Sequence, residues 1–199
     1  TSLNPKMTPS EFGSDLKTLC KGFKNNYNLI GNFDQEILVL TDLDAPKYRL
    51  VSINPMDVNP ENWKNILPEG KDLLENVTTA GGDLIASFLV DASTRVKHYN
   101  KLGKLIKEIE LPGIGTASIN GCTRDKSIIS YTYVSFTEPG KIQFYDLKTQ
   151  IQKDWGATPN YKFDPTQFET KQVFYPSKDG TKVPMFIMYK KGLNLNGNN

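Results

Sequence analysis

The sequence contains few of the side chains on which metal binding and covalent chemistry most often depend. Its 199 residues include one histidine, His98, and two cysteines, Cys20 and Cys122. One imidazole and two distant thiols form no pattern of metal ligands, so we expect neither a metal site nor another cofactor. Two cysteines also exclude a disulfide framework; one bridge is possible, but two free, buried thiols are the favoured interpretation.

A strong charge of one sign and long apolar runs are also lacking. The 24 basic and 22 acidic side chains leave a net charge of +2, which argues against nucleic-acid binding as the main role. No apolar run reaches the roughly 18 residues of a membrane-spanning helix, and residues 1–17 lack the basic start and apolar segment of a signal peptide. We interpret a lysine cluster as exposed strand and turn positions; it comprises Lys97, Lys101, Lys104 and Lys107.

What the sequence does contain is a weak internal repeat of four short segments. An apolar stretch that runs into a polar turn begins at Asn25, Asp72 and Gly115, with start-to-start spacings of 47 and 43 residues. Each is followed by a strongly apolar run, an alternating run and a short run with alternate polar positions. These begin at Glu36, Asp83 and Ser127 for the second segment, at Lys47, Arg95 and Lys141 for the third, and at Asn62, Lys104 and Thr149 for the fourth.

Four short strands about every 40 to 50 residues are typical of β-propeller blades, so we predict an all-β fold. A second strand that is apolar on both faces suits burial between neighbouring blades, and an amphipathic fourth strand suits an outer edge. Segment 104–111 also fits a helical spacing. A strand is favoured there because Leu111-Pro112-Gly113 ends the segment early.

The repeats predict three blades, at 25–70, 71–112 and 113–160. Residues 1–24 then form the remnant of a preceding blade: a helix from Ser10 is the alternative, but alternation over 15–22 favours an outer strand. Three blades cannot close a propeller, which needs roughly four to eight, so the chain is expected to be part of something larger or to self-associate. Residues 159–165 look like a linker that leaves the last blade.

A hairpin is predicted over 172–192. Apolar residues recur at period two on both arms, and Asp179-Gly180 supplies the turn because glycine accepts a positive φ. Pro176 and Pro184 each remove a donor from the ladder, so the hairpin belongs at a sheet edge or is irregular.

Several patterns that suggest chemistry are better explained by structure. The hydrolase pattern G-x-S-x-G is absent from the sequence, and His98 in an alternating run is expected to be a surface or inter-blade strand residue. Asp42 and Asp44 lack the rest of a calcium loop, and segment 113–125 lacks the third glycine and the helix of a phosphate loop. Asn76 begins a formal glycosylation sequon, which matters only in a secreted eukaryotic protein.

Three segments, 27–53, 129–147 and 172–187, resemble the prolyl oligopeptidase family. They carry a T-x-x-D-A-P turn, a Ser-Phe-Thr-x-Pro turn before I-x-x-Y-D-L, and QVFYPSKDGTKVPMFI. The resemblance implies a partial seven-bladed propeller over 25–165 that caps an α/β-hydrolase domain, of which 166–199 would be the first, truncated strands. It implies a serine peptidase that cleaves short peptides after proline, with the propeller limiting access to them.

None of that family's catalytic residues can be assigned to this chain, because its serine, aspartate and histidine would follow Asn199. Implied partners are short proline-containing peptides, the remaining blades and the hydrolase domain, with no nucleic acid or membrane. The compartment stays open, because the resemblance is compatible with a cytoplasmic or a bacterial periplasmic location. Two alternatives stay open: a stand-alone propeller-like binding module, and a related oligopeptidase or dipeptidyl peptidase with another specificity.

The chain alone is therefore expected to be catalytically inert. We predict that the pure 199-residue chain does not hydrolyse a proline-directed chromogenic peptide, because no nucleophile–base pair is assignable in it. Reproducible release of the chromophore, scaling with protein concentration across independent preparations, would contradict this prediction.

Overall fold

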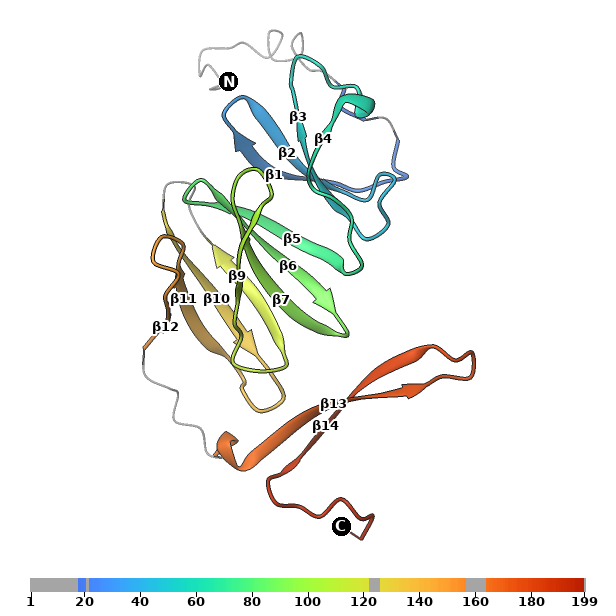
Figure 1. The fold of residues 1–199 in the computed structure, drawn as a ribbon, viewed down its shortest axis with the longest axis vertical. Coiled ribbons are helices and arrows are strands. Elements are labelled where there is room, and N and C mark those ends of the chain that lie inside the picture. Colours follow the sequence, from blue (N-terminus) through green and yellow to red (C-terminus); the bar gives the residue numbers. More distant parts are fainter. Residues whose placement is uncertain (1–17, 21, 122–125, 157–163, 199) are drawn as a thin grey trace.

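A computed structural model describes residues 18–20, 22–121, 126–156 and 164–198. This part of the chain is almost entirely β, with three four-stranded antiparallel sheets and a two-stranded hairpin (Figure 1). Its helical elements are two three-residue 3-10 helices, Pro60–Asn62 and Pro165–Gln167. No helix in these described ranges is long and apolar enough to cross a membrane.

The three sheets follow one another along the chain as three blades. The first blade comprises β1 (Tyr27–Phe33), β2 (Glu36–Thr41), β3 (Arg49–Ile53) and β4 (Lys64–Leu67). The second comprises β5 (Leu73–Ala80), β6 (Asp83–Val90), β7 (Ser93–Tyr99) and β8 (Leu105–Ile109). The third comprises β9 (Thr116–Gly121), β10 (Ile128–Val134), β11 (Lys141–Asp146) and β12 (Gln152–Asp154), and the hairpin comprises β13 (Phe168–Pro176) and β14 (Lys182–Lys190).

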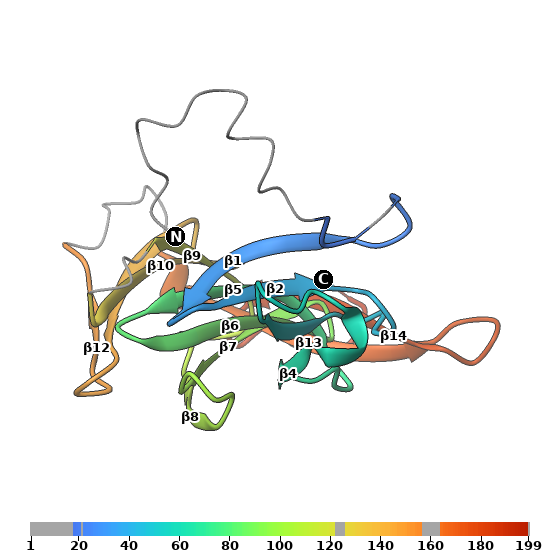
Figure 2. The ribbon, with the colours of Figure 1, turned by 90° about the horizontal axis from the view of Figure 1, so that it is seen from above.

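Within each blade the strands lie in chain order, so every blade is an antiparallel meander. This confirms the predicted three four-stranded blades. Strand β8 also confirms that segment 104–111 forms a strand and not a helix. In the turned view, the outermost strands β4, β8 and β12 lie along one side and β1 along the other (Figure 2). Half of the predicted strand over 15–22 lies outside the described residues, as does most of the linker at 159–165. Residues 18–20 form no strand.

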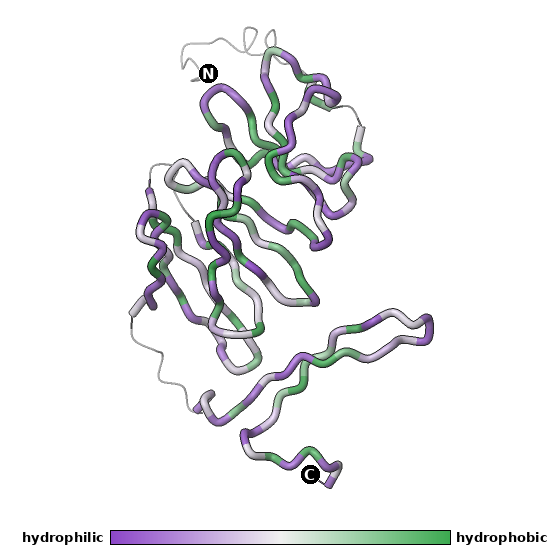
Figure 3. Tube along the Cα trace, viewed as in Figure 1, coloured by the Kyte–Doolittle hydropathy of each residue, from purple (hydrophilic) through white to green (hydrophobic). Residues whose placement is uncertain are grey.

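Two of the buried clusters lie between neighbouring blades, and a third lies on the other face of the first blade, around Val39, Val51 and Trp63. Leucines of the first two blades form one buried cluster, which includes Leu38, Leu40, Leu50, Leu74 and Leu84. The second and third blades meet through another, which includes Ile85, Val96, Ile129, Tyr131 and Tyr145. Figure 3 shows hydrophobic residues along the blade strands and hydrophilic ones at many of the turns. Because each fully buried large side chain contributes about 1.5–3 kcal/mol, these interfaces dominate the stability of the blades.

The second strand is buried on both faces in the first two blades but on only one face in the third. The central residues of β2 and β6 are buried on both faces, as predicted. The expectation fails for β10: Ile129, Tyr131 and Tyr133 are buried, but Ile128 and Val134 on the other face are exposed. Among the described residues no buried cluster lies on that face of the third blade, whereas Trp63 covers the outer face of the first.

The innermost strand of each blade also carries a register shift. On β1 it falls between Leu29 and Gly31, on β5 between Leu74 and Asn76, and in the β9–β10 pair beside Ser130. A β-bulge leaves one residue unpaired and bends the strand. The inner edges are therefore poor templates for pairing with another strand.

His98 lies in the interface between the second and third blades, which confirms the inter-blade alternative. Its side chain is 1% exposed. Nε2 lies 3.0 Å from Oδ2 of Asp83, and Nδ1 lies 3.1 Å from the hydroxyl of Tyr145. Burial raises the pKa of Tyr145, so its hydroxyl stays protonated in this network. Both ring nitrogens thus have partners, one within its own blade and one across the interface.

We predict that substitutions in this network destabilise the blades. Tyr145→Phe should cost about 0.5–1.5 kcal/mol, because it removes one buried hydrogen bond. His98→Ala should cost about 2–4 kcal/mol, since it adds a cavity and leaves the Tyr145 hydroxyl unpaired. Urea unfolding measures both, with Tyr175→Phe as the matched control at an exposed hydroxyl. Equal stabilities of His98→Ala and the control would show that the network contributes nothing.

Candidate functional site at the blade face beside the hairpin

The hairpin predicted over 172–192 forms around the predicted turn, and its first strand begins earlier, at Phe168. Its ladder runs from Phe168↔Lys190 to Pro176↔Lys182. At the tip, the Thr181 amide donates to Oδ1 of Asp179 at 3.0 Å, and Gly180 takes φ +83°. Hydrogen bonds from the Ser177 hydroxyl and the Thr181 amide lower the pKa of Asp179 to about 2. Asp179 therefore holds this turn as a carboxylate at neutral pH.

The two prolines fit their positions in the hairpin. Pro184 pairs with Phe174, and Pro176 pairs with Lys182 at the end of the ladder. Among the described residues β13 and β14 pair only with each other, so both are edge strands, as predicted for proline-bearing strands. A two-stranded hairpin is marginally stable alone, so its contacts with the blades matter.

Contacts among the described residues join the hairpin to the second and third blades. The Phe186 ring on β14 lies 5.5 Å from the Phe136 ring, centroid to centroid, at an interplanar angle of 47°. Gln172 Nε2 on β13 donates to the carbonyl oxygen of Asp91. Phe136 lies in the β10–β11 turn and Asp91 in the β6–β7 turn. Equivalent turns of successive blades thus form one face, and Figure 1 shows the hairpin beside that end of the blades.

Local hydrogen bonds determine how Phe136 is presented. Ser135 Oγ accepts from the amides of Thr137 and Glu138, and the Ser135 amide donates to the Glu138 carbonyl at 2.8 Å. The turn is closed by these bonds, and Phe136 projects from it with 60% of its surface exposed. Aromatic residues held this way are suited to docking against another apolar surface.

Two clefts border the blade face beside the hairpin. One, of about 260 Å³, is mainly apolar and is lined by residues that include Ala92, Ile114, Val134, Phe136 and Phe186. The other, of about 320 Å³, is rich in hydroxyls and includes Tyr133, Ser135, Thr137, Thr166 and Thr170. Burial raises the pKa of Tyr133, so this hydroxyl stays protonated. The face thus offers apolar contacts and hydroxyl groups, together with the charged side chains of Glu138 and Lys141 on the wall of the second cleft.

A glycine at this face is required by packing. A Cβ at Gly115 would lie 2.3 Å from the Val134 carbonyl oxygen. The Gly115 carbonyl in turn accepts from the Thr94 amide at 2.9 Å, which links the second blade to the third. Segment 113–125 therefore includes an inter-blade connection and strand β9. This agrees with our preference for a structural role over a phosphate loop.

The other candidate residues have structural partners. Both carboxylate oxygens of Asp42 accept hydrogen bonds of 2.7 Å from Asn26, and those bonds lower the pKa of Asp42. Asp44 lies in a turn at φ +51°. No group of three or more histidine, cysteine, aspartate or glutamate side chains in the described ranges could hold a metal.

The cysteines and the sequon are only partly described. Cys20 is free, as expected, but half-buried rather than buried; Cys122 lies outside the described residues, so the burial of its thiol stays a prediction. Asn76 is exposed on β5.

Three of the four clustered lysines make separate local contacts. Lys97 Nζ lies 4.8 Å above the Phe88 ring centroid, Lys101 pairs with Asp34 at 3.6 Å, and Lys107 donates to the Gln150 carbonyl. These positions form no single basic surface for a polyanion.

The sheets and the hairpin together define the chain as part of a β-propeller followed by strands of another sheet. A family profile described as "Prolyl oligopeptidase, N-terminal beta-propeller domain" matches residues 4–157. The chain belongs to the prolyl oligopeptidase family, as the three resembling segments indicated.

Individual relatives agree with this assignment. The prolyl endopeptidase of Elizabethkingia meningoseptica is 37% identical over 186 residues, which cover 94% of this chain and 26% of the relative. The dual function macrocyclase-peptidase POPB of Galerina marginata is 33% identical over 191 residues, covering 93% and 26%. The chain thus spans about a quarter of the length of these curated relatives.

Solved structures show the same fold. A prolyl endopeptidase structure has a TM-score of 0.79 and 35% identity, covering 88% of this chain and 26% of that chain. The apo structure of Galerina marginata POPB has a TM-score of 0.80 and 29% identity, covering 89% and 26%. These matches support a partial propeller as the fold of this chain.

We predict that Phe186→Ala loosens the hairpin from the blade face. Loss of an aromatic pair worth about 0.5–1.5 kcal/mol should speed hydrogen exchange of β14 amides about two- to tenfold, with the blade amides unchanged. Met188→Ala, an exposed residue on the same strand, is the control. Equal exchange in the two variants would mean that the ring contact does not hold the hairpin.

Proposed function

We propose that this chain is the substrate-gating propeller segment of a serine peptidase that cleaves short peptides after proline. Residues 25–165 form its three blades, at 25–70, 71–112 and 113–160, after a remnant of a preceding blade at 1–24. Residues 166–199 begin the peptidase domain. Family membership over 4–157 and the printed activity of its relatives support this proposal.

The observation that carries the proposal is the contact of the hairpin with one face of the blades. Gln172 and Phe186 bring β13 and β14 against the turns that contain Asp91 and Phe136. A domain continuing from the hairpin would lie over this face, and peptides reaching it would pass the propeller. Steric exclusion then selects short, unfolded substrates without any catalytic side chain in the blades.

The catalytic serine, histidine and aspartate of such an enzyme lie outside this chain in our proposal. His98 has both ring nitrogens engaged with Asp83 and Tyr145, so it is unsuited to the role of a catalytic base. The blades would instead limit access and position the substrate chain. No cofactor takes part in this scheme.

A chimaera tests the proposed function. Residues 1–199 would replace the matching quarter of the Elizabethkingia meningoseptica prolyl endopeptidase, and the rate of cleavage of a short proline peptide would be compared with that of a folded protein. We expect peptide cleavage and rejection of the protein, as in the parent enzyme. A folded chimaera that cleaves both substrates equally well would contradict gating by these blades.

A further inference from the structure

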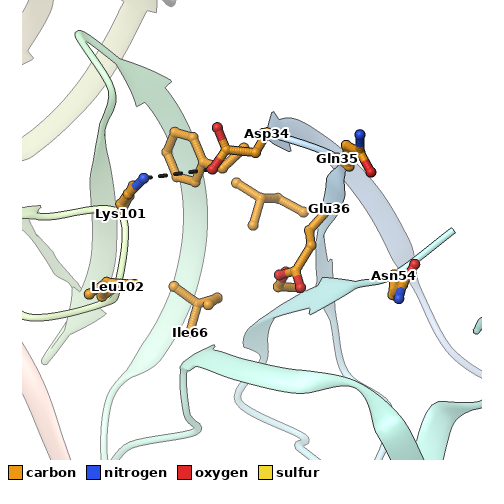
Figure 4. Close-up of a pocket in the computed structure, with 10 residues that line it drawn as sticks. Asp34, Gln35, Glu36, Asn54, Ile66, Lys101 and Leu102 are labelled. Atoms are coloured by element: carbon orange, nitrogen blue, oxygen red, sulfur yellow. Dashed lines mark hydrogen bonds and ion pairs between the residues drawn. The ribbon is translucent and has the colours of Figure 1, made fainter. Parts of the chain in front are cut away.

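An inter-blade cleft opens between the first and second blades, at the opposite end of the strands from the hairpin. Its volume is about 450 Å³. The β1–β2 and β7–β8 turns border it, whereas the hairpin contacts the β6–β7 and β10–β11 turns, and successive turns of a meander alternate between ends. In Figure 4, Asp34 faces Lys101 across the cleft, Glu36 projects into it, and Ile66 and Leu102 lie on the facing side.

The walls of this cleft are fixed by close packing between the blades. A Cβ at Gly103 in the β7–β8 turn would lie 1.9 Å from the Ile66 carbonyl oxygen on β4. Gly103 takes φ +80°, and its amide donates to the Asn100 carbonyl at 2.9 Å. The turn that carries Leu102 is therefore pinned against the first blade.

Glu36 is an acidic residue that projects into the cleft (Figure 4). Its Oε1 lies 2.6 Å from Nζ of Lys64, and its Oε2 accepts a hydrogen bond from the Ser52 hydroxyl. These bonds, first that of Lys64 and then that of Ser52, lower the pKa of Glu36. A carboxylate has about four lone-pair sites, so Glu36 retains capacity for a further donor.

In the interface between the second and third blades, a carboxylate at the equivalent position binds an imidazole ring. Asp83 begins β6 as Glu36 begins β2. Ser52 on β3 and His98 on β7 occupy equivalent positions. Ser52 pairs with the residue two positions after Glu36, and His98 pairs with the residue two positions after Asp83. Asp83 holds the buried imidazole of His98 at 3.0 Å. In the first interface the much smaller serine leaves space at the equivalent position.

We propose that the inter-blade cleft binds a protonated imidazole, free or as the histidine side chain of a peptide, with one ring N–H donating to Glu36. Phe33 and Leu102 provide apolar surface for the ring. Asn54, also on the wall, accepts from the Met56 amide through Oδ1 at 2.9 Å, and the second lone pair of that oxygen can accept from the other ring N–H. Glu36 would thus do for a bound ring what Asp83 does for His98.

The charges around the cleft define a pH window for this binding. Asp34 lies in the β1–β2 turn, Glu36 begins β2, Lys64 lies on β4 and Lys101 lies in the β7–β8 turn. Lys64 pairs with Glu36, and Lys101 pairs with Asp34. A guest imidazole is protonated below roughly pH 6.5. Because the pKa of Glu36 is lowered, its carboxylate stays ionised well below that pH. Binding is therefore present in mildly acidic solution and is lost as the pH rises through about 6.5.

Amide NMR of the 199-residue chain with imidazole as the probe tests this proposal. At about pH 5.5, roughly one unit below the ordinary imidazole pKa, we expect saturable shifts at Glu36, Ser52 and Leu102, with a dissociation constant on the order of millimolar for so small a ligand. Glu36→Gln should weaken binding about tenfold or more, because it removes a charge-assisted hydrogen bond. Glu108→Gln, at an exposed carboxylate on β8, is the matched control.

Ser52→His gives an independent readout that does not require loss of Glu36. The new side chain should occupy the cleft and abolish the saturable shifts, and a well-dispersed spectrum would verify the fold. Pyrazole, a planar N–H ring that stays neutral, should not compete with imidazole. A blocked histidine amide that binds as well as imidazole would identify peptides as the natural source; one that fails to bind would restrict the site to free imidazoles.

Three outcomes would overturn the proposal. They are shifts that never saturate, equal binding by pyrazole, and unchanged imidazole binding in a folded Ser52→His variant. If Glu36→Gln fails to fold, the Ser52→His and pyrazole results decide. None of these measurements depends on peptidase activity, so the proposed function and this site can fail separately.

Discussion

Burial of both faces of a blade sheet is the constraint on which this structure depends. Leu38 and Leu40 of β2 are covered by the second blade and Ile85 of β6 by the third, so the first blade requires the second and the second requires the third; Trp63 of the first blade covers the opposite face of β2. Apolar contact supplies most of the stability, at about 25 cal/mol per Å². Polar links then fix the register between blades: the Leu74 amide donates to the Lys47 carbonyl, and His98 meets Tyr145. Each such bond contributes only about 0.5–1.5 kcal/mol but excludes other arrangements.

The same constraint produces the two ends of the propeller segment. Since every blade is a meander packed face to face with its neighbour, equivalent turns gather at one end. The turns with Asp91 and Phe136 become a surface that the hairpin contacts. The opposite end receives the β1–β2 and β7–β8 turns, which border a cleft lined by Ser52, the residue equivalent to His98. We propose that the blades gate and position ligands and that the chemistry belongs to a domain that the hairpin would begin.

The sequence predicted the strands well because alternation, apolar runs and turn residues are local properties of the chain. It could not predict that Ile128 and Val134 are exposed, since that depends on whether another sheet covers β10. Nor could it predict that Asp83 and Tyr145 hold His98, because Tyr145 lies 47 residues away. Phe136 was missed although an exposed aromatic residue in a polar turn was a visible signal. A comparison of equivalent positions in the repeats would also have shown that Ser52 in the first blade corresponds to His98 in the second.

The most direct test of mutual dependence uses the two tryptophans, which lie in different blades. Trp63 is buried in the first blade, and Trp155 packs against Phe144 beside the third. Urea unfolding of the single-tryptophan variants Trp155→Phe and Trp63→Phe would follow each blade separately by fluorescence. If the blades depend on one another through their faces, both probes report one transition with the same midpoint and slope, after correction for the stability of each variant by circular dichroism. Separate midpoints for the two tryptophans within variants of equal overall stability would show that the blades fold independently, which contradicts the account.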